Sequence, residues 1–174
     1  MTSDGIAIRP LAVGELPAYK TLRDAMLAAF PEAFTSDAGT EFARPAESYA
    51  SRVGSTLTPG GQITLAAWQG DALLGAITCE REGRLKMQHV GHVLGMMVGA
   101  EAHGQGVGRA LLAACIAVAR ETAGVELLTL SVTAGNAAAT HLYERAGFVR
   151  YGSLPRAIKV EDRYHAKDLM VLAL

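Results

Sequence analysis

Three alternate glycines, Gly104, Gly106 and Gly108, lie between an apolar strand-like run and a long apolar helix-like run. Small residues at this spacing let successive backbone N–H groups point into one hollow at the positive end of the helix dipole. A phosphate group fits such a hollow. One glycine would indicate only a tight turn, but three that open a long helix favour the binding of an anion.

Two familiar phosphate motifs do not match this turn. A P-loop ends in Gly-Lys-Ser/Thr, whereas Gly108 is followed by Arg109 and Ala110, so both the lysine and the magnesium-binding hydroxyl are missing. The dinucleotide fingerprint Gly-x-Gly-x-x-Gly would place its third glycine at Arg109 or Leu111. We therefore expect neither a P-loop nor a dinucleotide site.

The segments on either side of the turn predict a mixed α/β fold. Apolar alternation bounded by turn residues predicts strands at 6–11, 63–68, 72–80, 89–98, 126–132, 148–153 and 164–172. Helical spacing and end signals predict helices at 13–30, 45–53, 107–124 and 136–146, with a mobile loop at 31–44. The strand before the turn and the strand after its helix should form a parallel pair with a right-handed crossover.

Composition limits the classes of protein that the chain can belong to. The chain has 174 residues, of which 50% are apolar, so we expect a single domain over residues 1–174 with one core. A net charge of −1 gives no long-range attraction for phosphodiesters. Nucleic acid is therefore not an expected partner.

Membrane and metal sites are also not expected. Residues 1–5 contain an early acid and no basic-then-apolar stretch, which argues against a secretory signal. The longest apolar run, 110–119, is about half the length that a bilayer requires. Cys79 and Cys115 stand alone in apolar segments, as buried thiols of a reducing compartment do. We expect a soluble, cytoplasmic protein without a metal.

Two stretches resemble the GNAT superfamily of acetyl-CoA-dependent N-acetyltransferases. The first is HGQGVG at 103–108, which is similar to the family motif Gln/Arg-x-x-Gly-x-Gly/Ala, except that His103 replaces Arg or Gln. The second is LSVTAGNAAATHLYERAGF at 130–148, which resembles the family's strand-Asn-helix-Tyr-Gly-Phe signature. The resemblance implies a mixed sheet of six to seven strands flanked by about four helices. Its order would be strand, two helices, three strands, helix, strand, helix and two strands.

The same resemblance implies acetyl-CoA as the co-substrate and assigns residues to it. Its pantetheine arm would enter between two splayed parallel strands and contact the backbone of Met96, Met97 and Val98, where one N–H would polarise the thioester carbonyl. Asn136 would lie near the arm. The pyrophosphate would be held by Gln105, Gly106, Val107, Gly108 and Arg109, and the adjoining His103 and Gly104 belong to the same cofactor-binding turn.

Tyr143 matches the tyrosine that often protonates the departing thiolate in this family. A thiolate leaves more readily when a hydroxyl donates to its sulfur. The alternative interpretation is a core aromatic residue beside Leu142, as for most tyrosines on amphipathic helices. The surrounding motif favours the catalytic role.

The acceptor amine must lose a proton, because an alkylamine is mostly ammonium at neutral pH. Several relatives use a carboxylate six residues before the position that matches Val98, and here that residue is His92. An imidazole can serve as the base directly or through water. His89, Glu80 and Glu101 compete for this role, as does a water ordered by backbone carbonyls, and a structural role for His92 stays open.

Acceptor recognition in this family implicates 31–52 and 153–165. Carboxylates outnumber Arg44 in the first segment, and they are Glu32, Asp37, Glu41 and Glu47. They form either an acidic mouth for a cationic amine or an ordinary solvated surface. The predicted function is acetyl transfer from acetyl-CoA to a primary amine of a small molecule or a protein. A non-catalytic acyl-CoA sensor and a nucleotide-binding module are the alternatives, and both a monomer and a homodimer stay open.

Overall fold

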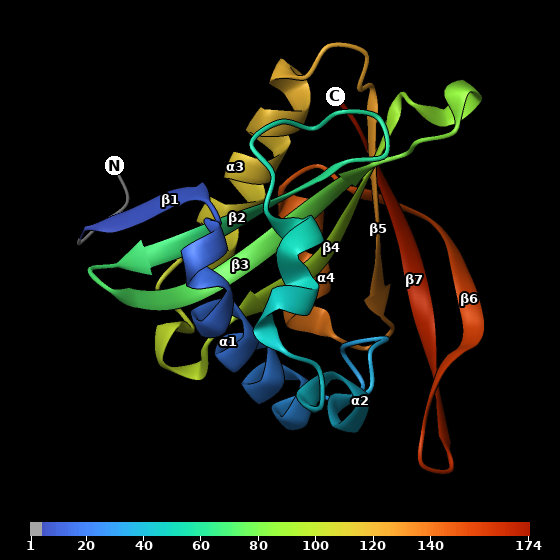
Figure 1. Ribbon diagram of the computed structural model, residues 1–174. Helices are drawn as coiled ribbons and strands as arrows, with labels where there is room; N and C mark the ends of the chain where they lie inside the picture. Colours follow the sequence, from blue (N-terminus) through green and yellow to red (C-terminus); the bar gives the residue numbers. More distant parts are fainter. Residues whose placement is uncertain (1–4) are drawn as a thin grey trace.

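The computed structural model describes residues 5–174, and seven strands form one sheet in the order β1-β2-β3-β4-β5-β7-β6 (Figure 1). The strands are β1 Ile6–Pro10, β2 Gln62–Gln69, β3 Ala72–Arg81, β4 Val90–Val98, β5 Leu127–Thr133, β6 Val149–Val160 and β7 Arg163–Ala173. All seven predicted strands are confirmed. Residues 1–4, on which most of the argument against a secretory signal depends, lie outside the described residues.

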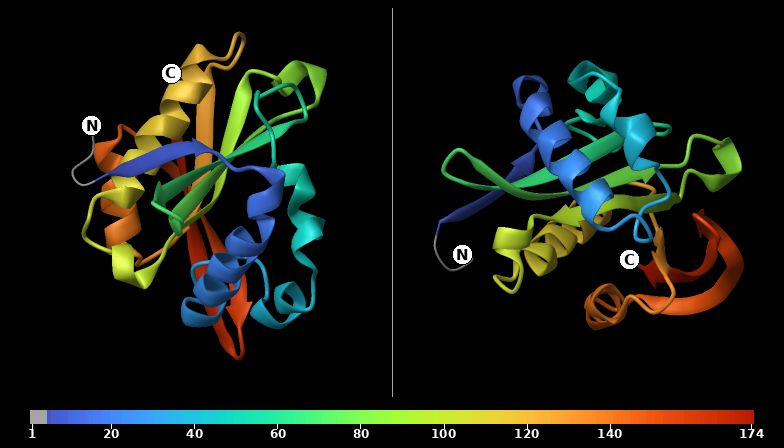
Figure 2. Two further views of the ribbon diagram at one scale, coloured as in Figure 1. Left: turned by 60° about the vertical axis from the view of Figure 1, so that its left-hand side comes forward. Right: turned by 90° about the horizontal axis from the view of Figure 1, so that it is seen from below.

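Four α-helices cover the sheet: α1 Leu16–Ala29, α2 Ala38–Phe42, α3 Val107–Glu121 and α4 Ala137–Arg145. Figure 2 shows α1 and α2 on one face and α3 and α4 on the other. Each face has its own apolar cluster. Tyr19 of α1 belongs to one, and Leu111 of α3 and Phe148 belong to the other. The predicted element order is confirmed.

The strands β4 and β5 are parallel but pair over a short distance. Their register joins Val90 to Leu127 and ends with His92 opposite Thr129, whereas β4 continues to Val98. Gly95 has a φ of +59°, in the left-handed region, and the register of β4 with β3 shifts nearby. This bulge bends β4 away from β5. The two strands therefore diverge towards their carboxyl ends.

Three local predictions were wrong in extent. The predicted loop 31–44 contains the short helix α2, which Asp37 caps by accepting hydrogen bonds from the Thr40 N–H at 2.7 Å and the Thr40 hydroxyl at 2.9 Å. The predicted helix 45–53 is a 3-10 helix, Ala46–Arg52. Strand β6 continues past Pro155 to Val160, because an edge strand tolerates proline at a bulge.

Glu41 joins the elements that pack over the first face of the sheet. Its carboxylate accepts hydrogen bonds from Arg23 of α1 at 3.1 Å, from Arg44 at 3.1 Å and from the Tyr49 hydroxyl at 2.5 Å. Burial by itself would raise the pKa of Glu41, but the bonds from Tyr49 and Arg23 outweigh burial and lower that pKa to about 2. Glu41 is thus a structural anion.

The acidic mouth expected at 31–52 does not form as a unit. Glu41 is neutralised in the network just described, and Asp37 is a helix cap. Glu47 lies exposed on the 3-10 helix. Only Glu32 of this set lines the cavity described below.

Replacement of Glu41 by Gln should destabilise the fold in a pH-dependent way. Because the folded-state pKa lies below the ordinary value of 4.5, its stabilisation is complete above about pH 4.5 and is lost as the pH falls towards 2. We expect Glu41→Gln to lower the free energy of unfolding by about 2–3 kcal/mol at pH 7. Urea unfolding between pH 7 and 2.5 measures it.

The matched control for this experiment is Glu47→Gln, which makes the same change of charge on an exposed side chain. It should alter the free energy of unfolding by less than about 0.5 kcal/mol. Parallel pH profiles for the wild type and Glu41→Gln would contradict the assigned role of Glu41.

Candidate active site

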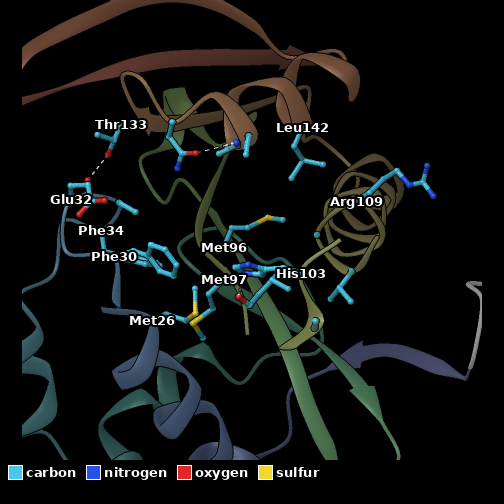
Figure 3. A pocket seen from close by; sticks show the side chains of 18 of the residues that line it. Met26, Phe30, Glu32, Phe34, Met96, Met97, His103, Arg109, Thr133 and Leu142 are labelled. Atoms are coloured by element: carbon cyan, nitrogen blue, oxygen red, sulfur yellow. Dashed lines mark hydrogen bonds between the residues drawn. The ribbon is translucent and has the colours of Figure 1, made fainter. Parts of the chain in front are cut away.

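A cavity of about 1230 Å³ passes through the sheet where β4 and β5 diverge (Figure 3). The glycine turn and the first turn of α3 form its wall on one side, together with the start of α4. The end of α1, residues 32–34 and His165 of β7 form the wall on the other side. One cavity therefore connects the two faces of the sheet.

The glycine turn presents unpaired backbone donors to this cavity. Gly104 and Gly106 have φ values of +76° and +79°, which only glycine adopts without strain. The first N–H of this helix to bond backward is that of Ala110, to the Gly106 carbonyl at 3.0 Å. The N–H groups of Val107 and Gly108 precede it at the positive helix end and have no intrahelical acceptor. The turn thus fits a phosphate anion.

Gly108 lets the helix approach its neighbours. A Cβ atom added there would lie 3.2 Å from the Met96 Cε atom and 3.6 Å from Leu142 Cδ2. A side chain at this position would therefore push into the wall between β4, α3 and α4. The glycine at 108 therefore lets the first turn of α3 lie against Met96 and Leu142.

Backbone and side chains at the end of β4 form the middle of the cavity. Met96, Met97 and Val98, which the resemblance assigns to the pantetheine arm, all line it. The His103 ring also lines it, and its Nε2 atom donates to the Val98 carbonyl at 2.8 Å. Its ring centroid lies 6.4 Å from that of Phe30. The Val98 carbonyl, which we expected to bind the cofactor, therefore already accepts a hydrogen bond from His103.

Gln105 and Arg109, the other polar residues of the turn, also line the cavity, and Arg109 Nη2 lies 3.8 Å from the position of a Cβ added at Gly106. Gln105 donates from Nε2 to the Glu101 carbonyl at 2.8 Å, so it closes the turn on itself. Arg109 is exposed, and Figure 3 shows its guanidinium pointing away from β4.

Asn136 lines the cavity at the start of α4. Its Oδ1 atom accepts a hydrogen bond from the Ala139 N–H at 3.2 Å, which caps the helix. Capping fixes the orientation of the amide, so its NH₂ group faces away from the helix backbone and is available to a ligand. Leu142, six residues later on the same helix, completes this wall.

Tyr143 lies in the core and is not among the described residues that line the cavity. Its side chain is 8% exposed, and its ring packs edge-on against Phe148 at a centroid distance of 6.0 Å. Burial, and to a lesser extent the nearby Cys115, raises the pKa of Tyr143 to about 12. The phenol is therefore fully protonated at neutral pH.

His92 lies on β4 outside the cavity wall, at the narrow end of the gap. Its Nδ1 atom is 2.7 Å from the Thr129 hydroxyl, and its Nε2 atom is 3.7 Å from a carboxylate oxygen of Glu82. Its competitors His89, Glu80 and Glu101 do not line the cavity either, within the described part of the chain. The four side chains that the sequence offered as the base therefore lie outside the described cavity wall.

A row of hydroxyls connects His92 with the cavity. Thr129, Ser131 and Thr133 alternate along β5, so their side chains lie on the same face of the sheet. Thr129 contacts His92 at one end, and Thr133 lines the cavity at the other. This row was not anticipated: Ser131 and Thr133 lie inside the quoted motif at 130–148, but the motif assigns no role to their hydroxyls.

The far wall of the cavity is apolar with two polar side chains. Met26, Phe30 and Phe34 supply the apolar surface, and Glu32 and His165 the polar one. The helical period of α1 marks Met26 and Phe30 as core positions only. Whether they face a cavity depends on where β4 diverges from β5, and the helical spacing of apolar residues in α1 contains no information about that.

Comparison with known proteins identifies the fold. The sequence model of the acetyltransferase (GNAT) family matches residues 19–148, about three quarters of the chain. The chain belongs to the GNAT acetyltransferase family. Mycothiol acetyltransferase of Salinispora tropica is 33% identical over 153 residues, which cover 86% of this chain and 47% of that protein. The GNAT chain thus spans about half the length of this relative.

Solved GNAT structures superpose over nearly the whole chain. A GCN5-related N-acetyltransferase from Kribbella flavida has a TM-score of 0.79 at 26% identity, with 98% of each chain covered. A putative acetyltransferase from Salmonella typhimurium, solved with its cofactor acetyl-CoA, has a TM-score of 0.78 at 18% identity. The superposition covers 98% of this chain and 95% of the Salmonella chain. These likenesses confirm the predicted fold.

Cysteines, metals and membrane spans were the remaining expectations of the sequence. Cys79 and Cys115 are free and buried, as predicted. Within residues 5–174, no group of three His, Cys, Asp or Glu side chains is placed to hold a metal ion. Over the same residues, no helix combines the length and the apolar surface needed to cross a bilayer.

Gly104→Ala should weaken the binding of acetyl-CoA more than it weakens the fold. An alanine in the left-handed region costs about 1–2 kcal/mol of stability and shifts the turn that presents the N–H donors. We expect about a tenfold loss of affinity, measured by calorimetric titration with acetyl-CoA.

Gly70→Ala is the matched control. Gly70 lies in the β2–β3 hairpin with a φ of +57°, and neither glycine has an atom within 4 Å of an added Cβ. Gly70→Ala should therefore lose a similar amount of stability and keep its affinity. Equal affinities for the two variants would refute the assignment of the cradle.

Proposed function

We propose that this GNAT domain transfers the acetyl group of acetyl-CoA directly to a primary amine of a small molecule or a protein. The observation that carries the proposal is that one cavity connects the two faces of the sheet. Direct transfer requires donor and acceptor to meet without an intermediate on the protein. A cavity with a phosphate-binding turn on one face and an apolar, partly charged wall on the other meets this requirement.

The residues on the donor side fit the cofactor. The N–H groups of 106–109 would hold its pyrophosphate, and the backbone of Met96–Val98 together with the Asn136 amide would orient its pantetheine arm. When bound, acetyl-CoA supplies the activated acyl group as a thioester. His103 would release the Val98 carbonyl to the arm by a rotation of its side chain.

Thermal shift and thiol release test the proposal together. Acetyl-CoA should raise the melting temperature, while ATP and NAD at equal concentration should not. With acetyl-CoA and a panel of amines, CoA thiol should be released with at least one acceptor. Stabilisation by ATP or NAD alone would contradict the cofactor assignment.

A non-catalytic acyl-CoA sensor is the second candidate. Two observations favour it: Tyr143 lies outside the cavity wall, and His103 occupies the Val98 carbonyl. A sensor binds acetyl-CoA but releases no CoA thiol with any acceptor. The same pair of measurements therefore separates the two functions.

Tyr143 is proposed as the acid that protonates the departing thiolate. Its raised pKa keeps the proton in place at neutral pH, and its neighbour Leu142 lines the cavity. Tyr143→Phe keeps the ring that packs against Phe148 and removes only the hydroxyl. We expect kcat to fall about tenfold or more while the Kd for acetyl-CoA stays nearly the same. An unchanged kcat would leave Tyr143 as a core residue.

His92 is proposed as the base, acting through water along the β5 hydroxyls. Ser131 and Thr133 continue the path from Thr129 towards the cavity. A proton can leave the ammonium along such a chain without direct contact between the amine and the imidazole.

His92→Ala should lower kcat/KM by about tenfold to a hundredfold and change the shape of its pH profile. The profile is measured from pH 5.5 to 9 with wild type, His92→Ala and His89→Ala. A profile for His92→Ala that overlays the wild type would eliminate His92. A change confined to His89→Ala would transfer the role to His89.

A further inference from the structure

Lys167 of β7 is a half-buried cation beside the far wall of the cavity, the side on which we expect the acceptor amine to bind. Its Nζ atom donates to the Thr35 hydroxyl at 2.6 Å and lies 3.5 Å from the Ser131 hydroxyl. Both neighbours are neutral. Burial lowers the pKa of Lys167, because the surroundings solvate its charge less well than water does.

No carboxylate within residues 5–174 forms an ion pair with Lys167. Its neighbour Asp168 points to the opposite face of the strand, where it pairs with Arg150 at 3.4 Å. Glu32 on the cavity wall also forms no ion pair within these residues. This corner of the cavity thus has one cation, Lys167, and one anion, Glu32, that form no ion pair with each other.

The position of Lys167 relates it to the cavity. Thr133, its direct partner across the β5–β7 ladder, lines the cavity. His165 precedes it by two residues on the same face of β7 and also lines the cavity. Thr35, which holds its ammonium group, follows Phe34 of the cavity wall. Lys167 therefore lies next to the end of the cavity at which we expect the acceptor to bind.

The hairpin that carries Lys167 is basic. Between Val149 and Ala173 it has five Lys and Arg side chains and three Asp and Glu side chains. Figure 1 shows that the turn of this hairpin extends beyond the rest of the sheet, on the side where α2 lies. An anionic group that approaches this side is attracted by the hairpin as well as by Lys167.

We propose that Lys167 binds an anionic group of the acceptor, so that the preferred substrate is a small primary amine that also carries a carboxylate or a phosphate. This inference rests on the proposed transferase function. The ammonium of such a substrate faces Glu32, and its anion takes the place of the Thr35 hydroxyl at the Lys167 ammonium. Met26, Phe30 and Phe34 accommodate the apolar part of the molecule.

A purely structural role for Lys167 makes a different prediction. The bond to Thr35 ties the segment after α1 to β7, and a second bond ties it to β5, from the Thr133 hydroxyl to the Glu32 carbonyl at 2.6 Å. If Lys167 only tethers this segment, removal of the Thr35 hydroxyl should have the same effect as removal of the ammonium group. Thr35→Val is therefore the matched control.

The test compares CoA thiol release with paired acceptors in the full chain. One pair is L-methionine and L-methioninamide, and the other is phosphoethanolamine and ethanolamine, so the two pairs distinguish carboxylate from phosphate. The two members of each pair differ in the basicity of the amine as well as in charge. The readout is therefore the change that each substitution causes in the ratio of kcat/KM within a pair.

For the anionic member of the preferred pair, Lys167→Met should lower kcat/KM about tenfold to a hundredfold, mainly through KM. For the neutral member it should change kcat/KM by less than about threefold. Lys167→Arg should restore most of the preference, and Thr35→Val should keep it. The Kd for acetyl-CoA should be unchanged in all three variants.

Three outcomes would overturn the inference, and they are distinguishable. Equal losses for Lys167→Met and Thr35→Val on both members of each pair would assign Lys167 to the tether. CoA release without any effect of Lys167→Met on the ratios would remove the subsite and leave the transferase. Binding of acetyl-CoA without CoA release from any amine would remove the transferase and the subsite with it.

Discussion

The divergence of two parallel strands determines the rest of this structure. β4 and β5 pair only from Val90 to His92, and the backbone of β4 beyond that point faces a partner strand that has moved away. Buried backbone N–H and C=O groups need partners, so this edge must be satisfied by side chains or by a ligand. His103 satisfies one carbonyl, that of Val98. The remainder of the edge is the natural place for the amides of an extended cofactor.

Two glycines of β4 set the shape of this gap. Gly91 lies where an added Cβ would come within 2.8 Å of Leu128 Cδ2, so its lack of a side chain keeps the strands close at one end. Gly95 bends the strand at the other end. A wedge-shaped opening results, with its narrow end towards His92. This arrangement explains why the candidate base is separated from the cavity by hydroxyls, while the apolar end of α1 reaches the cavity directly.

The sequence predicts the donor side far better than the acceptor side. The glycine turn and Asn136 are read from short contiguous motifs, because their roles depend on local backbone conformation. Glu41 appears in the sequence as one surface carboxylate among four, and only the packing of α1 against the 3-10 helix makes it a buried anion. Strand β6 is underestimated because Pro155 and its charged neighbours break the alternation, which an edge strand tolerates.

The two bonds that hold the segment after α1 join parts of the chain 101 and 132 residues apart. The phosphate-binding turn, in contrast, is complete within a few residues of sequence. During synthesis the glycine turn leaves the ribosome before β7, so the donor side can form while the far wall of the cavity still lacks that strand. Because of the same separation, the β6–β7 hairpin can change in evolution without disturbing the glycine turn.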